Sequence, residues 1–125
     1  MLEEEELERS TLQQLTQTLR SLPHVRTDNL DVRYSGGMSD AGIDATLDVE
    51  IANKDVVLLV QIKRSVFPRD VRQLLWQLHK AREGFGYGRN VVPLVAAESV
   101  SAGARAILLS ENVGFFDVGG SLFIP

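Results

Sequence analysis

The sequence predicts an α/β (α+β) domain in which helices flank a mixed central sheet, with the element order α-β-β-β-α-β-α-β. Residues 43–51 alternate between apolar and polar side chains, which is typical of a strand with one face in the core. Residues 56–63 form a nearly continuous aliphatic run, which is typical of a central strand covered on both sides. After Pro68, apolar residues repeat at helical spacing: Val71, Leu74, Leu75 and Leu78.

The first half of the chain begins with a helix that we expect to run from near Leu2 to Leu22, where Pro23 ends it. Leucines 12, 15, 19 and 22 form its apolar stripe, and the capping-box spacing of Ser10 and Gln13 leaves open an ordered start only there. Alternating apolar residues then predict a first strand over 30–34, followed by a loop at Gly36-Gly37.

The second half continues with a glycine-rich loop over 84–88 and a buried strand over 91–97. Ser99 or Ser101 can cap a third helix that carries Ala106, Ile107 and Leu109 and that Gly114 terminates. Residues 115–124, with a turn at Gly119-Gly120, close the sheet.

Composition bounds the class of protein. At 125 residues and 44% hydrophobic content, residues 1–125 form one domain. The absence of cysteine excludes disulfides and thiolate zinc sites, and His24 and His79 lack the spacing of a zinc pair. No apolar run reaches the roughly 18 residues of a membrane span, and the acidic N-terminus is unlike a signal peptide. We therefore expect a cytoplasmic protein without a membrane partner.

A carboxylate, an amide and a lysine are expected to converge on the first hairpin. Asp44 precedes Gln61 by 17 residues, and Lys63 shares the face of Gln61. A turn of two or four residues within 52–55 would place Asp44 opposite Lys63, and Thr46 opposite Gln61. Oxygen ligands of this kind suit Mg²⁺, while the lysine can stabilise charge on a phosphate. The alternative interpretation is an ordinary cross-strand ion pair.

These residues, together with the element order, resemble the PD-(D/E)xK nuclease superfamily. The Gly42-Ile43-Asp44 and Gln61-Ile62-Lys63 pair is most similar to its Mrr-like restriction endonuclease (QxK) branch. The resemblance implies a restriction-endonuclease-like αβββαβ core and Mg²⁺- or Mn²⁺-dependent endonuclease activity, with DNA as the expected substrate. It further implies that Asp44 and Gln61 are metal ligands and that Lys63 is the catalytic lysine.

Gln61 supplies one negative charge fewer than an acidic residue would. Related nucleases often take an extra acidic residue from an N-terminal helix, and Glu8 projects onto the leucine stripe, so Glu8 is the candidate for a further metal ligand. The alternative is that Glu8 belongs to a frayed acidic helix end without a chemical role.

A basic segment follows the proposed metal ligands. Residues 63–89 carry seven basic and two acidic side chains, a net charge of +5, whereas the remainder of the chain carries −9. We expect nucleic acid to contact Arg64, Arg69, Gln73, Gln77 and Lys80. By resemblance, either Gln73 or Gln77 approaches the active site.

The same helix face admits two other interpretations, a homodimer seam around Trp76 or a solvated surface. A second hypothesis for the whole chain is a degenerate nuclease fold that binds nucleic acid or a protein partner without cleavage. We also expect the domain to belong to a larger multidomain protein.

Overall fold

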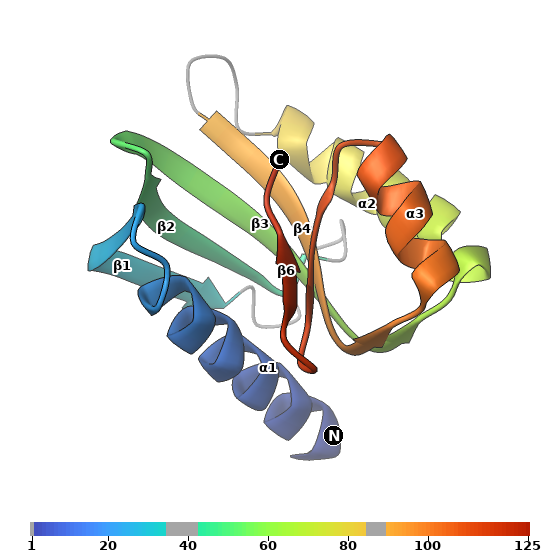
Figure 1. The fold of residues 1–125 in the computed structure, drawn as a ribbon. Coiled ribbons are helices and arrows are strands. Elements are labelled where there is room, and N and C mark those ends of the chain that lie inside the picture. The colour runs from blue at the N-terminus through green and yellow to red at the C-terminus, as the bar shows by residue number, and fades with distance from the viewer. Residues whose placement is uncertain (1, 35–42, 85–89) are drawn as a thin grey trace.

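The computed structural model describes residues 2–34, 43–84 and 90–125. The helices are α1 (Leu2–Arg20), α2 (Pro68–Glu83) and α3 (Ala102–Ser110). The strands are β1 (Val25–Tyr34), β2 (Ala45–Ile51), β3 (Lys54–Val66), β4 (Asn90–Val100), β5 (Gly114–Asp117) and β6 (Ser121–Phe123) (Figure 1). The predicted order is confirmed, with the closing segment folded as a β5–β6 hairpin.

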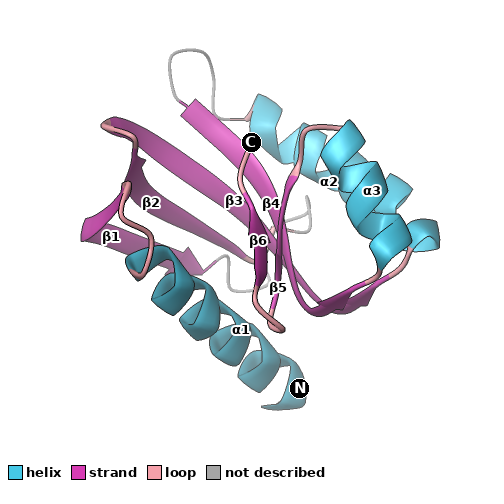
Figure 2. Ribbon diagram, in the orientation of Figure 1, coloured by secondary structure: helices cyan, strands magenta, loops and turns pink. Residues whose placement is uncertain are grey.

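One mixed sheet connects the strands in the order β1-β2-β3-β4-β5-β6. β3 pairs with β4 and β4 with β5 in parallel, whereas the other neighbouring strands pair antiparallel. The parallel pairs are those joined through α2 and α3, since a helical crossover returns the chain in the same direction. Helix α1 covers one face of the sheet, and α2 and α3 cover the other (Figure 2).

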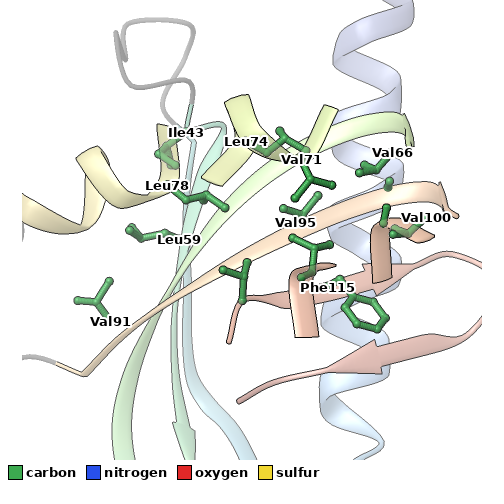
Figure 3. Packing of buried hydrophobic residues seen from close by; sticks show 14 of the residues in the cluster. Ile43, Leu59, Val66, Val71, Leu74, Leu78, Val91, Val95, Val100 and Phe115 are labelled. Atoms are coloured by element: carbon green, nitrogen blue, oxygen red, sulfur yellow. The ribbon is translucent and has the colours of Figure 1, made fainter. Parts of the chain in front are cut away.

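Each face of the sheet has its own hydrophobic core. On one face, Leu12, Leu15 and Leu19 of α1 pack among buried residues of the central strands. On the other, Val71, Leu74 and Leu78 of α2 pack with residues such as Leu59, Val95 and Phe115 (Figure 3). β3 supplies side chains to both cores in alternation: Val56, Leu58 and Val60 to the first, and Val57 and Leu59 to the second.

Helix α1 begins at Leu2, as expected, and not at the alternative start near Ser10. It ends at Arg20, two residues earlier than predicted. Helix α3 starts after the Ser101 cap, whose hydroxyl accepts the Ala104 N–H, and its buried residues are Ala104 and Leu108. Leu109 is instead exposed.

Gly114 does not terminate α3, because it is already the first residue of β5. Asn112, with a φ of 58°, redirects the backbone after the helix through the left-handed conformation that asparagine tolerates. The glycine pair at 36–37 and residues 85–88 of the second loop lie outside the described residues.

Within residues 2–34, 43–84 and 90–125, none of the helices is both long and apolar enough to span a bilayer.

Asp117, at the end of β5, joins three elements of the C-terminal half. Its Oδ2 accepts the Val100 N–H at 2.7 Å and the Arg105 Nη2 at 2.9 Å, and its Oδ1 accepts the Gly119 N–H at 2.7 Å. Burial alone raises the pKa of Asp117, but these donors outweigh it, so the pKa of Asp117 lies below its ordinary value.

We predict that Asp117 makes the fold acid-sensitive. A carboxylate with a lowered folded-state pKa stabilises the fold above its ordinary pKa of about 3.9. That contribution is lost as the pH falls through the lower, folded-state pKa. The free energy of unfolding, measured by urea titration, should therefore fall between about pH 5 and about pH 2, and it should fall less in Asp117→Asn.

The matched control is Asp55→Asn, which changes an exposed carboxylate. This variant should keep the pH dependence of the natural chain. An identical pH dependence in the Asp117 and Asp55 variants would contradict the assignment.

Candidate functional site

The turn between β2 and β3 sets which residues face each other across the hairpin. Ala52 and Asn53 form it, and both have positive φ, 51° and 67°, as in a type I′ turn. Ile51 therefore pairs with Lys54, and Thr46 with Leu59. The predicted register, with Ala52 opposite Asp55 or Ile51 opposite Val56, is wrong by two residues. Because the shift is even, each strand keeps its assignment of side chains to faces.

Asp44 consequently lies beside Gln61 rather than opposite Lys63. The last pair of β2 is Ala45 with Val60. Just before it, the Asp44 N–H donates to the Val60 carbonyl at 3.0 Å, and the Asp44 Oδ2 accepts the Ile62 N–H at 2.7 Å. Asp44 thus binds the backbone on both sides of Gln61, through its own N–H at Val60 and through its half-buried carboxylate at Ile62.

The alternation over 43–51 predicted that Ile43 shares a core face with Ala45 and Leu47, and this prediction is wrong. Ile43 precedes β2, and its buried side chain joins the cluster of Leu59 and Leu78 on the α2 side (Figure 3). The alternation predicted for 43–51 holds for the strand itself, from Ala45 onward.

Gln61 is a polar side chain in the interior of the domain, with 1% of its surface exposed. Its Nε2 donates to the Oε1 of Gln77 on α2. Its own Oε1 is buried and has no hydrogen-bond partner among the described residues. An unmatched buried amide oxygen destabilises a fold, so an external donor or a cation is the natural complement for this atom.

Lys63 and Arg64 follow near the end of β3, and both are exposed, whereas Val66 at the end of the strand is buried again. Lys63 pairs in register with Ala97 of β4, two positions beyond the pair of Gln61 with Val95. Gln61 and Ile62 are therefore the last buried residues of β3 before two exposed cations.

The resemblance left open whether Gln73 or Gln77 of α2 approaches the active site, and the two residues differ in burial. Gln77 is half-buried and contacts Gln61, whereas Gln73 is exposed, as are Arg69 and Lys80. The rotation of the helix explains the difference, since it is fixed by the burial of Val71, Leu74 and Leu78.

Glu8 lies on α1, whose buried leucines pack on the opposite face of the sheet from α2. The described residues hold no group of three His, Cys, Asp or Glu side chains arranged to bind a metal ion. Glu8 as a metal ligand stays a prediction.

A hollow of about 710 Å³ lies at the other end of the β2–β3 hairpin, away from Gln61. Charged residues of both signs line it: Arg26, Asp28, Asp48, Glu50, Lys54 and Asp55. Its position and mixed charge separate it from the Asp44–Gln61 pair.

The six-stranded mixed sheet with this helix placement is similar to the fold of a solved structure, that of EndoMS in apo form, an endonuclease, which supports a nuclease-type fold. The TM-score is 0.50 at 20% sequence identity, over 92% of this chain and 46% of the EndoMS chain, so the chain spans about half the length of EndoMS. Comparisons with protein-family models and with curated proteins found no match. The Mrr-like branch stays a prediction.

The first prediction from this site concerns the hairpin turn. Alanine in the left-handed conformation is strained by roughly 1–2 kcal/mol, whereas asparagine adopts it readily. Ala52→Asn should therefore raise the free energy of unfolding by about 0.5–1 kcal/mol in urea titrations. The reciprocal change Asn53→Ala should lower it, and changes of the opposite sign would refute this turn geometry.

The second prediction concerns the Gln61–Gln77 contact. Gln77→Leu leaves the buried Nε2 of Gln61 without an acceptor, so unfolding should become easier by about 1–3 kcal/mol. Gln77→Glu retains an acceptor and should lose less. Equal losses for the two variants, measured by thermal or urea unfolding, would show that the contact does not stabilise the fold.

Proposed function

We propose that this chain is a metal-dependent nuclease domain that hydrolyses phosphodiester bonds in nucleic acid, with DNA as the expected substrate. The observation that carries the proposal is the unmatched, buried Oε1 of Gln61 on β3 beside Asp44, which directly precedes the neighbouring strand β2. The fold similarity to EndoMS supports the same class of activity.

The donor atoms fit a hard divalent cation. Asp44 supplies carboxylate oxygens and Gln61 supplies an amide oxygen, and both atom types are ligands that Mg²⁺ and Mn²⁺ accept. When bound, such an ion supplies Lewis acidity toward the phosphate and the attacking water. Asp44 and Gln61 are therefore the proposed ligands, and Glu8 is the residue to test as a third.

The remaining side chains have roles that follow from their positions. Gln77 accepts a hydrogen bond from the Gln61 Nε2 and so holds the Gln61 amide in place, which leaves the Gln61 Oε1 for a ligand. The Lys63 ammonium, on the same strand, can stabilise the negative charge that develops on phosphate oxygens. Arg64 near the end of β3, and Arg69 and Lys80 on α2, are exposed cations and are suited to the nucleic-acid backbone.

One observation favours a second candidate function. Gln61 carries no charge, and the part of the chain that the structure describes gathers no triad of acidic or imidazole ligands. A cation is bound more weakly as ligand charge decreases. The alternative is a degenerate nuclease fold that binds nucleic acid or a protein without cleaving it.

We predict that the purified chain nicks supercoiled plasmid in Mg²⁺ or Mn²⁺, and that Asp44→Ala and Lys63→Ala each reduce the rate by at least about 100-fold. Gel electrophoresis of the plasmid measures the rate. In parallel, Mn²⁺ should raise the melting temperature of the natural chain but not that of Asp44→Ala, because an ion bound only by the folded state stabilises it.

Asp55→Ala is the matched control, because it removes an exposed carboxylate at the other end of the hairpin. It should cleave like the natural chain. Equal cleavage by all variants would assign the activity to a contaminant. Absence of both cleavage and a melting shift would favour the degenerate alternative, which Gln61→Glu tests further by restoring the missing charge.

A further inference from the structure

We propose that the outer face of α2 binds single-stranded nucleic acid, with an unpaired base stacked on Trp76. This inference rests on the proposed function for the chemical class of the polymer. It goes beyond that function by naming the form of the strand and the residue that selects it.

Four residues of α2 form one surface stripe, which we call the α2 stripe: Arg69, Gln73, Trp76 and Lys80. They stand at i, i+4, i+7 and i+11, so they project from one side of the helix. All four are exposed, Trp76 to 59%. From Arg69 to Lys80 the stripe extends about 16 Å along the axis, which is enough for a short stretch of strand.

Both ends of the α2 stripe pair a cation with an aromatic ring. The Lys80 Nζ lies 5.0 Å from the centroid of the Trp76 ring, and the Arg69 Cζ lies 5.2 Å from that of Phe67. Phe67, just before the helix, is itself 44% exposed. Alternating cations and open rings are the pattern that binds single strands, because phosphates meet the charges while bases stack on the rings.

The charges near the stripe favour an anion. Arg72 adds a further exposed cation on the same helix and makes no ion pair with any described residue. Of the acidic neighbours, Asp70 accepts the Phe67 N–H at 2.8 Å and lies 4.0 Å from the Arg69 Nε. Glu83 lies at the helix end, 3.3 Å from His79. Most of the cationic charge therefore faces solvent.

Two other occupants fit less well. A second copy of the chain in a two-fold dimer would place this cationic surface against itself, and the like charges would repel. A duplex keeps its bases stacked on one another, so an exposed indole gains no base face from it. Only an unpaired strand complements both the cations and the ring of Trp76.

The test uses the intrinsic fluorescence of Trp76, which is the single tryptophan of the chain. The full chain is titrated in EDTA, where no cleavage occurs, with an oligothymidylate of about 12 nucleotides and with a duplex of equal length. The single strand should quench the fluorescence saturably and bind at least about tenfold more tightly than the duplex. In fluorescence anisotropy with labelled oligothymidylate, Trp76→Ala should weaken binding by about 5- to 150-fold, the range for loss of one stacked base.

Leu109→Ala is the matched control, since Leu109 is an exposed apolar residue of α3 outside the α2 stripe. It should bind like the natural chain, and Trp76→Phe should recover much of the affinity. Lys80→Gln should lower the slope of log affinity against log salt by about 0.7.

Equal affinity of the Trp76→Ala and Leu109→Ala variants would overturn the inference, as would equal affinity for duplex. A dimer seen by light scattering that Trp76→Ala abolishes would overturn it in favour of an interface between copies. Quenching without plasmid cleavage would refute only the proposed nuclease activity. Cleavage that Trp76→Ala leaves unchanged, together with undiminished binding, would refute only this inference.

Discussion

Strand β3 is buried under a helix layer on each side, and the positions of the other elements depend on this double burial. Leu58 and Val60 anchor it to the α1 core, while Leu59 anchors it to the α2 core. Hydrogen bonds to β2 and β4 occupy both of its edges. A polar side chain in the same strand must then be satisfied in a dry environment or destabilise the domain. Gln61 lies in that environment, where its Nε2 donates a hydrogen bond to Gln77 and its Oε1 has no hydrogen-bond partner among the described residues.

The geometry of the crossover brings the remaining groups to the same place. β3 ends at Val66, and α2 begins two residues later and runs back over the sheet. This return places Gln77 against Gln61, while Asp44, just before β2, binds the backbone of the next residue, Ile62. The buried part of the candidate site and the exposed α2 stripe are thus two sides of one helix. A nucleic-acid strand stacked on Trp76 would therefore lie against α2, the same helix that positions the amide of Gln61 through Gln77.

Much of the fold could be predicted because hydrophobic periodicity follows burial directly. The two-sided burial of β3 and the inward face of α2 left clear patterns in the sequence. The hairpin register was not predictable, because it depends on Ala52 adopting a backbone conformation that alanine disfavours. The hydrophobic pattern also could not show which of Gln73 and Gln77 faces the sheet, since both are polar and only the rotation of α2 about its axis distinguishes them. The contacts of Asp117 were hidden because its partners come from separate elements.

The position of the two-residue turn at Ala52–Asn53 determines which residues of β2 and β3 lie opposite each other. Moving this two-residue turn by one position along the chain would slide one strand past the other by about 6–7 Å, while every side chain of the two strands kept its face of the sheet. Asp44 would then no longer lie beside Gln61. A three-residue turn would instead shift the register by an odd number and exchange the faces of one strand.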